Sequence, residues 1–393
     1  MADIHQEETQ AYADSTTLTP LHVPPGGEEA VEGPDPQMSE LLDSYYALLQ
    51  RRQIVYPVAF RFVGELGRGR QGVVFLALRH GARGCVTRHA IKVHNPGIYP
   101  SAKSYWTDMG RIASQTSSMQ SITSPNLVSR ETYDEVSGIG YTQMEVIHGI
   151  DVNEFIAGLH NERVKSRLSE RDWTRLFDVL FRRHADGLRV QPGIAIYLMR
   201  MVLRGLEVLH RRGFIHGDVK PANIMIDRLG TVKLVDYGRA LRADEGKPVL
   251  FGSPLYMAPE IHLWKPSRPQ SDLYSVGMLG LVLMAGKRAI TQRARSEKEL
   301  LDFKMTLPDR LPELLPPYVS ENVRFLNMLR RFLAPDPGHR FPDAQTAETD
   351  AEGLRAVHKQ LTLSGKDSDY VREVAKFVEA VDLDFWRTVT LEL

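Results

Sequence analysis

Residues 214–226 read FIHGDVKPANIMI, a stretch in which four side chains that form strong hydrogen bonds lie between apolar residues. These side chains belong to His216, Asp218, Lys220 and Asn223. Burying them without partners costs free energy. The stretch is therefore either a solvated turn between two strands or a site that faces a charged ligand, and the surrounding sequence decides between the two.

The composition is typical of a globular protein. The 393 residues suffice for one large domain or two ordinary ones. Lysine plus arginine (49) equals aspartate plus glutamate (49), so net charge does not point to nucleic acid or a membrane surface as a partner. Cys85 is the single cysteine, which excludes a disulfide within this sequence and fits a reducing compartment. We therefore expect a cytoplasmic protein.

The distribution of apolar residues argues against secretion and membrane insertion. The first twenty residues, MADIHQEETQAYADSTTLTP, lack the basic start and apolar centre of a signal peptide. The run VGMLGLVLMAG (residues 276–286) is too short to span a bilayer and predicts a helix buried in a core. We expect no membrane span.

The order of the predicted elements indicates an α+β fold with two lobes. Residues 60–148 predict a small lobe of antiparallel strands with one helix, and residues 149–347 predict a larger, mainly helical lobe. Together they form the predicted main domain, residues 60–347. Because clefts between lobes commonly hold ligands, we expect the site there.

Three flanking segments complete the predicted organisation. Residues 1–37 are polar, acidic and proline-rich, and we expect a disordered tail. Residues 38–59 predict a short helix, with Ser39 as its N-cap, followed by a linker. Residues 348–393 predict a C-terminal helical extension that includes an amphipathic helix.

The segment LGRGRQGVVF (residues 66–75) contains a G-x-G-x-x-G pattern between two predicted strands. A strand–turn–strand context argues against a dinucleotide site, which needs a following helix. Gly67, Gly69 and Gly72 would let backbone N–H groups approach phosphate oxygens without a Cβ in the way. Taken alone, the pattern is equally typical of a plain β-turn.

Lys92 lies in the predicted strand AIKV, where alternation places it on the same face as Ala90 and opposite Ile91 and Val93. An ammonium group on the face towards the glycine-rich hairpin could reach the α- and β-phosphates of a nucleotide. The alternative is an ordinary lysine on a solvated strand face.

The opening stretch and the segment LVDYG that follows it offer the groups that phosphoryl transfer needs. Asp218 can orient an attacking hydroxyl or accept its proton, and Lys220 can neutralise the moving phosphoryl group. Asn223 and Asp236 offer oxygen ligands of the kind that Mg²⁺ prefers. The alternative is a surface β-hairpin with a solvated turn.

Together these motifs resemble, in order and spacing, those of a eukaryotic-type protein kinase over residues 60–347. The matching positions are Gly67, Gly69 and Gly72 (glycine-rich loop), Lys92 (strand lysine), His216-Gly217-Asp218 with Asn223 (catalytic loop), Asp236-Tyr237-Gly238 (D-F-G), Ala258-Pro259-Glu260 (A-P-E), Asp272 (start of the large buried helix) and Arg340 (partner of the A-P-E glutamate). The resemblance implies a bilobal fold that uses ATP and Mg²⁺.

The resemblance also implies the contacts of the nucleotide and of the acceptor. Beyond the glycines and Lys92, the ATP contacts would come from Leu66, Val74, Ala90, Met144, Glu145, Ile147, Asp151 and Met225. Asp151 would meet the ribose, and Met144 would be the gatekeeper. Lys220 and the segment GSPLYMAPE, with Ser253, resemble the form that transfers phosphate to Ser or Thr of a protein substrate.

The sequence departs from the family pattern at three positions. Gly217 stands where the family has an arginine that holds a phosphorylated activation loop, and no Ser, Thr or Tyr lies between Gly238 and Ser253. We therefore hypothesise that activity needs no phosphorylation of this loop. Tyr237 replaces phenylalanine.

Gln115 falls where the family has a helix glutamate that pairs with the strand lysine, and a neutral partner holds Lys92 less firmly.

Two other functions are weighed against an active Ser/Thr protein kinase. A pseudokinase scaffold would explain Gln115, but has no need of Lys92, Asp218, Asn223 and Asp236 together. A small-molecule kinase would explain the H-G-D form, but not the peptide-docking positions.

Residues 157–192 are longer than expected and predict one or two amphipathic helices, either a solvated insertion or a docking site.

Overall fold

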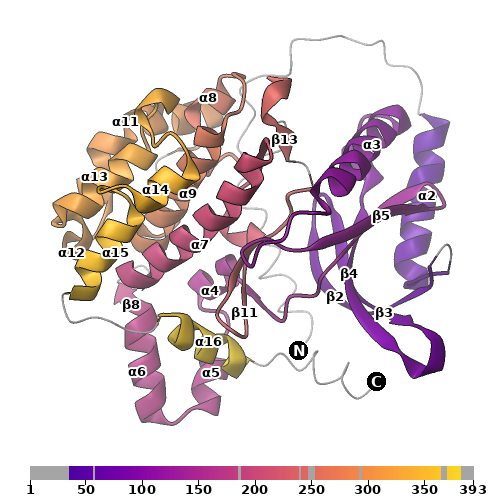
Figure 1. Cartoon of the computed structure of the whole chain (residues 1–393), viewed down its shortest axis with the longest axis horizontal. Helices are drawn as coiled ribbons and strands as arrows, with labels where there is room; N and C mark the ends of the chain where they lie inside the picture. The colour runs from indigo at the N-terminus through magenta and orange to yellow at the C-terminus, as the bar shows by residue number, and fades with distance from the viewer. Residues whose placement is uncertain are drawn as a thin grey trace. The chain divides into compact units, whose positions relative to one another are not determined.

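The computed structural model describes residues 35–55, 58–184, 187–238, 240–246, 253–291, 294–363 and 370–381. The predicted tail over residues 1–34 and the end of the predicted C-terminal helix beyond residue 381 lie outside these ranges. The described chain divides into two compact units, residues 35–149 and residues 150–380. In Figure 1 the first is drawn in indigo to purple and the second in magenta to yellow.

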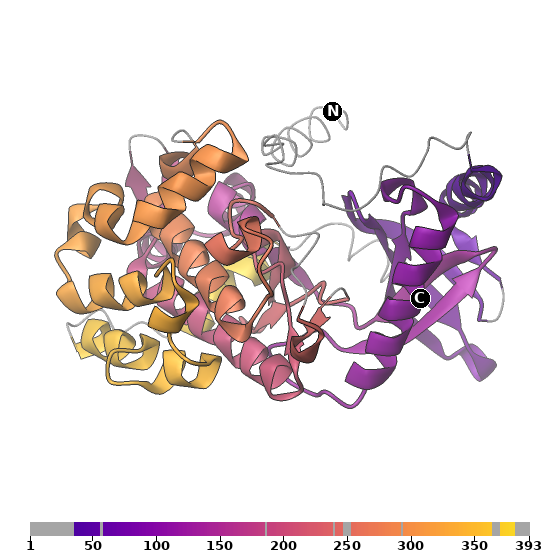
Figure 2. The same ribbon diagram turned by 90° about the horizontal axis from the view of Figure 1, so that it is seen from above.

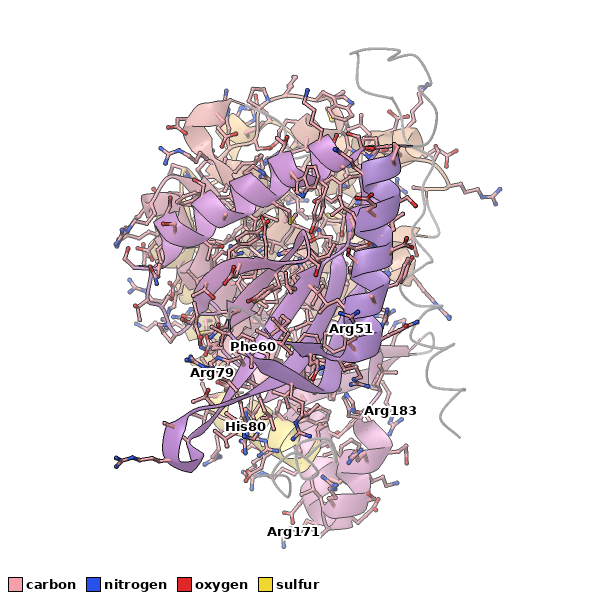
Figure 3. The ribbon with its side chains drawn as sticks, turned by 90° about the vertical axis from the view of Figure 1, so that its right-hand side faces the viewer. Arg51, Phe60, Arg79, His80, Arg171 and Arg183 are labelled. Carbon is pink, nitrogen blue, oxygen red and sulfur yellow. The ribbon has the colours of Figure 1, made fainter. Side chains whose placement is uncertain are left out.

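The N-terminal unit is built on a six-stranded antiparallel sheet with strand order β1-β2-β3-β4-β6-β5. Its strands are β1 Gln53–Ile54, β2 Phe60–Gly69, β3 Gly72–His80, β4 Val86–His94, β5 Arg130–Val136 and β6 Ile139–Met144. Two helices, α2 (Pro36–Arg51) and α3 (Ala102–Met119), cover one face, in front of the strands in Figure 3. Tyr45 of α2 and Met109 of α3 share one apolar core with Ile91 and Val93 of β4.

The N-cap of α2 is Asp35, four residues before the predicted cap Ser39. The carboxylate of Asp35 accepts from the backbone N–H of Gln37 at 3.0 Å, and Pro36 occupies the first helical turn, where its missing N–H has no consequence. The other carboxylate oxygen of Asp35 accepts from the N–H of Ala102, the first residue of α3, at 3.0 Å. One side chain therefore caps α2 and also bonds the first N–H of α3, whose own N-cap is Ser101.

The C-terminal unit is mainly helical. Its longer elements are α6 Glu170–Leu180, α7 Pro192–Arg211, α9 Pro269–Ala285, α11 Glu297–Leu314, α13 Val323–Phe332, α15 Leu354–Leu363 and α16 Tyr370–Val381. Its short helices are α4 Val152–Ala157, α5 Asn161–Arg167, α8 Pro259–His262, α10 Arg288–Thr291, α12 Pro317–Ser320 and α14 Ala344–Thr349. Helix α7 packs against α9, α14 and α15, as Figures 1 and 2 show from two sides.

Short strands of this unit carry the loops that matter for the site. A three-stranded sheet has the order β12-β11-β7, with β7 Gly149–Asp151, β11 Ile224–Asp227 and β12 Val232–Leu234. The pair β10 Phe214–Ile215 and β13 Leu241–Arg242 is antiparallel. Strands β11 and β12 are joined by a turn that contains Leu229 and Gly230, and Asp227 accepts from the N–H groups of Leu229 and Thr231.

Two further predictions from the sequence can be compared with the structure. Residues 276–285 lie in α9 and are buried, as predicted, and Gly286 is the C-cap of this helix. Residues 157–192 contain the two predicted helices, α5 and α6, and also an antiparallel hairpin, β8 Phe181–His184 with β9 Gly187–Val190, which the sequence did not indicate. Within the described ranges, no helix has both the length and the apolar character required to cross a membrane.

Candidate active site

The catalytic loop is held by a buried carboxylate at the start of α9. Asp272 accepts from the backbone N–H groups of His216 and Gly217, each at 2.8 Å, and interacts with Nε2 of His210 at 2.8 Å. Burial alone raises the pKa of Asp272, but the histidine and the backbone donors outweigh it and bring the pKa below its usual value. Gly217 has φ 79°, a left-handed backbone that favours glycine. The backbone before Asp218 is therefore fixed.

Four of the predicted site residues lie together at this loop. The ammonium of Lys220 lies 2.7 Å from Oδ2 of Asp218, and the amide of Asn223 donates to the same oxygen at 3.0 Å and to the Asp218 carbonyl at 2.8 Å. The other oxygen, Oδ1, accepts from the N–H of Ser253 at 3.0 Å, and Lys220 also donates to Oγ of Ser253 at 3.0 Å. Two charged groups and two polar groups thus form one cluster.

The geometry leaves the carbonyl oxygen of the Asn223 side chain for another task, because its NH₂ group makes both bonds to Asp218. Asn223 is buried, so this oxygen has a fixed direction. Asp236 follows β12 and has φ 58°, unusual for a residue other than glycine. Its neighbour Val235 donates to the carbonyl of Asn223 at 2.9 Å and accepts from His216. Asn223 thus directly precedes β11 and Asp236 follows its antiparallel partner β12, so the two predicted metal ligands come from the same end of this strand pair.

The A-P-E glutamate forms a buried ion pair. Arg340 donates to both oxygens of Glu260, at 2.8 and 2.7 Å, and also to the backbone carbonyls of Ala334 and Gln270. Ser271 donates to Glu260 as well, at 2.7 Å. Burial raises the pKa of Glu260, but the bonds from Arg340 and Ser271 bring it below its ordinary value. The pairing that the resemblance implies is therefore present.

In the N-terminal unit, the glycine-rich segment is the hairpin between β2 and β3, in which Gly69 pairs with Gly72. A Cβ on Gly72 would lie 2.0 Å from the carbonyl oxygen of Val93, so only glycine fits there. At Gly67 and Gly69 a Cβ would meet nothing within 4 Å, so these two are not required by packing. Packing within the fold therefore does not explain these two glycines.

Lys92 is half-buried on β4, between the core residues Ile91 and Val93. Its ammonium donates to Oε1 of Gln71, at the tip of the glycine-rich hairpin, at 3.2 Å. Gln115 is buried near the end of α3, one turn before Met119. The face of Lys92 predicted from the alternation of the strand is confirmed by the burial of its neighbours.

The predicted adenine-pocket residues are distributed over both units. Leu66, Val74, Ala90, Met144, Glu145 and Ile147 belong to the N-terminal unit, and Asp151 and Met225 to the C-terminal unit. Met144 is the last residue of β6 and pairs with Ala90. The N–H of Glu145 donates to the carbonyl of Ser129 at 3.0 Å, so of its backbone groups only the carbonyl could serve a ligand.

Asp151 caps α4 by accepting from the N–H of Glu154 at 2.7 Å. Burial raises the pKa of Asp151 to about 7, and the nearby charge of Glu154 acts in the same direction. A carboxylate with this pKa is half-charged near neutral pH, which is unusual for aspartate and is a common property of functional sites.

Three residues that contribute to the arrangement were not found from the sequence: Asp35, Gln71 and Lys304. Asp35 had a local signal, because an aspartate before a proline is typical of a helix start. Lys304 stands at a core position of α11, between the buried Leu300 and Leu307, where a lysine is unusual. Gln71 had no such signal.

The chain belongs to the protein kinase domain family, whose model matches residues 60–350. It is 31% identical to the serine/threonine-protein kinase PknA of Corynebacterium glutamicum over 160 residues, which cover 39% of this chain and 32% of that protein. It is 33% identical to PknA of Mycobacterium tuberculosis over 158 residues, which cover 39% of this chain and 36% of that protein. The matches span about a third of the length of these relatives.

Solved structures show the same fold. The kinase domain of PknI from Mycobacterium tuberculosis superimposes with a TM-score of 0.51 and 19% sequence identity, over 77% of this chain and 95% of that one. The predicted α+β fold is therefore confirmed as the protein kinase fold, with one lobe built on an antiparallel sheet and one helical lobe.

Proposed function

We propose that the protein is an ATP- and Mg²⁺-dependent serine/threonine protein kinase, which transfers the γ-phosphoryl group of ATP to Ser or Thr hydroxyls of a protein substrate. The hydrogen-bonded cluster of Asp218, Lys220, Asn223 and Ser253 carries this proposal. It combines a carboxylate that can orient a hydroxyl with a cation that can neutralise a phosphoryl group.

Each residue has a role in this proposal. Asp218 orients the acceptor hydroxyl and takes its proton, and Lys220 balances charge on the moving group. Lys92 and the backbone of Gly67, Gly69 and Gly72 bind the phosphates. The oxygens of Asn223 and Asp236 fit Mg²⁺, which prefers hard oxygen ligands and, when bound, would neutralise phosphate charge.

The remaining ATP contacts are proposed on the resemblance to the family. Val74 and Ala90 would lie above the adenine and Met225 below it, with Leu66 beside the glycine-rich hairpin. The carbonyl of Glu145 and the N–H of Ile147 would bind the adenine edge, next to the gatekeeper Met144. Asp151 would accept from the ribose hydroxyls. Glu260, Asp272 and Arg340 would support the peptide-docking side.

The domain organisation and location are part of the same proposal. We assign the kinase domain to residues 60–347, with lobes 60–148 and 149–347, and treat 1–37, 38–59 and 348–393 as flanking segments. The single cysteine supports a reducing compartment such as the cytoplasm.

We hypothesise that activity needs no phosphorylation of the activation loop, because Gly217 replaces the arginine that would hold the phosphate and no Ser, Thr or Tyr lies between Gly238 and Ser253. The left-handed φ of Gly217 supports this, because an arginine there would adopt a strained backbone. Phosphatase-treated protein should keep its activity, and loss of most activity would contradict this hypothesis.

The decisive experiment incubates the full chain with labelled ATP, Mg²⁺ and a generic protein acceptor, followed by phosphosite mapping. Wild-type protein should label Ser and Thr residues, and Asp218→Ala should lose about 10²–10⁴-fold of the transfer rate while still binding ATP. Label on tyrosine alone would contradict the Ser/Thr assignment. Label on an aminoglycoside but on no protein would favour a small-molecule kinase.

A second function, a pseudokinase scaffold, is favoured by one observation. Gln115, the neutral residue at the helix-glutamate position, is buried in α3 and cannot supply a charge to Lys92. A scaffold would bind ATP with the same affinity in wild type and Asp218→Ala, and would show no transfer in either.

A further inference from the structure

Lys304 is a fully buried lysine whose ammonium group has three partners. It projects from α11, its side chain has 0% exposure, and its neighbours one turn away are Leu300 and Leu307. The ammonium donates to the carbonyl of Pro254 at 2.5 Å, to the carbonyl of Met257 at 2.6 Å and to Nε2 of His262 at 3.0 Å. Because an ammonium group has three N–H donors, all of them are used.

The charge of Lys304 is balanced through His262. Since Nε2 of His262 accepts from Lys304, its Nδ1 carries the ring proton and donates to Oε1 of Glu297 at 2.7 Å. Burial and the charge of Lys304 lower the pKa of His262 to about 4, so the ring stays neutral at physiological pH. Burial lowers the pKa of Lys304 also, against the attraction of Glu297. The three side chains therefore form one hydrogen-bonded relay that runs from Glu297 through His262 to Lys304.

This relay ends on a segment whose other end touches the catalytic cluster. In residues 253–257, the N–H groups of Tyr256 and Met257 donate to the carbonyl of Ser253, which closes a compact turn. Ser253 bonds Asp218 through its N–H and Lys220 through its hydroxyl. The segment is thus held by the proposed catalytic residues at Ser253 and by Lys304 at Pro254 and Met257.

We propose that Lys304, with His262 and Glu297, is a positioning device for the acceptor peptide: it holds residues 253–257 in the shape that presents a Ser or Thr hydroxyl to Asp218. This inference rests on the proposed kinase function and deepens it, because it names the support of the acceptor side. Lys304 touches no reacting atom, so it acts only through the segment that it holds.

The physical basis is that both carbonyls are bonded by a buried charge. Removing the ammonium leaves the carbonyls of Pro254 and Met257 without this donor, and a buried polar group that has lost its partner is costly. The segment would then move, and the peptide would lose its contacts with the segment in the ground state and in the transition state alike, which raises the KM for the peptide. Binding of ATP depends on other residues and should not change.

The test compares Lys304→Met with Lys298→Met in the full chain. Lys298 is exposed on the same helix, so the second variant controls for the substitution itself. We expect Lys304→Met to lower kcat/KM for a peptide substrate about 100-fold, mainly by raising the peptide KM, with the KM for ATP unchanged. Lys298→Met should have the same KM for the peptide and the same KM for ATP as the wild-type protein.

A second pair of variants tests the relay if Lys304→Met does not fold. In His262→Gln, the amide oxygen can accept from Lys304 and the NH₂ group can donate to Glu297, so the peptide KM should stay near the wild-type value. His262→Met has a similar volume but neither group, and should raise the peptide KM. A merely structural role would instead lower the active fraction, which reduces kcat for every variant without changing either KM.

The outcomes separate the two proposals. A wild-type chain that transfers no phosphate overturns the proposed function, and this inference with it. A wild-type chain that does transfer, combined with an unchanged peptide KM in Lys304→Met or His262→Met, overturns the positioning role alone. Equal rises in the KM for ATP and for the peptide would also overturn it.

Discussion

The two units hold their candidate site residues by different means. In the C-terminal unit, Asp272, Glu260 and Lys304 are buried ions, each satisfied by several charge-assisted bonds. In the N-terminal unit, the glycine-rich hairpin has open space around Gly67 and Gly69, and Lys92 bonds the neutral amide of Gln71. A buried ion depends on its protein partners, whereas water can solvate a half-buried ion such as Lys92. The acceptor side is therefore set before any ligand binds, whereas the nucleotide side retains freedom to adjust.

The contrast fits the proposed chemistry. A hydroxyl acceptor carries little charge with which to organise its own site, so the protein must supply the geometry in advance. A nucleotide triphosphate carries several charges and can draw a lysine and backbone N–H groups towards itself. We therefore expect substitutions in the C-terminal unit to change stability strongly, and Gln71→Ala in the N-terminal unit to change mainly the KM for ATP.

The largest expected effect on stability is that of breaking the pair between Glu260 and Arg340. Arg340→Met should lower the free energy of unfolding by about 3–5 kcal/mol, because it leaves a buried carboxylate without its main partner. Denaturant unfolding measures this. The double variant Glu260→Gln with Arg340→Met should lose less than Arg340→Met alone, and a loss under about 1 kcal/mol in the single variant would contradict the role of charge in this unit.

The next effect concerns Asp151 and depends on pH. Its pKa in the folded protein, about 7, lies above its ordinary value of 3.8, so the folded chain binds this proton more tightly than the unfolded chain. The stability from this group is fully present below pH 3.8 and is lost as pH rises through 7. Asp151→Asn keeps a good helix cap and should stabilise the protein by about 1–2 kcal/mol more at pH 8 than at pH 5.

Thermal unfolding of wild type and Asp151→Asn at the two pH values measures this difference. If Asp151 also meets the ribose, the same variant should bind ATP more weakly at pH 8 while being more stable. Equal stabilisation at both pH values would show that the carboxyl titrates normally.

A smaller effect is expected from Asp35, which caps α2 and accepts from the first N–H of α3. The bond from the N–H of Ala102, the largest contribution, lowers the pKa of Asp35 despite desolvation. Asp35→Ala should lower the melting temperature by a few degrees, and hydrogen exchange should increase at the first turn of α3. Asp43→Ala, an exposed position on α2, is the matched control. Equal melting temperatures of Asp35→Ala and Asp43→Ala would show that the bonds of Asp35 to α2 and α3 do not contribute to stability.

The smallest effect should come from Gln71. Because Lys92 is half-buried, water can replace Gln71 as its partner, and the bond contributes only about 0.5–1.5 kcal/mol. Gln71→Ala should therefore reduce phosphoryl transfer only about 2–10-fold, through a higher KM for ATP. Arg79→Ala, at the opposite end of β3 and labelled in Figure 3, should have no effect. A loss of 100-fold in Gln71→Ala would mean that the nucleotide side is as rigidly organised as the acceptor side.

The sequence predicted the local parts of this arrangement and not its long-range parts. The strands around Asp227, the buried α9 and the face of Lys92 follow from alternation and from turn chemistry, which act over a few residues. The partners of Lys304 lie more than forty residues away along the chain, and no local pattern announces them. Ser39 was chosen as a cap by residue type, but Asp35 also reaches Ala102, a contact that only the folded chain reveals.

The helix before residue 60 has a practical consequence for anyone who prepares this protein. A recombinant fragment trimmed to the boundaries of the matched family, residues 60–350, would lack Leu41, Tyr45 and Leu48, which cover part of the sheet. It would also lack Phe377, which packs edge-on against Phe155 and Phe181. Such a fragment would expose the apolar surfaces that α2 and α16 cover, and it should therefore aggregate during purification. Expression should therefore begin upstream of Asp35 and continue through α16.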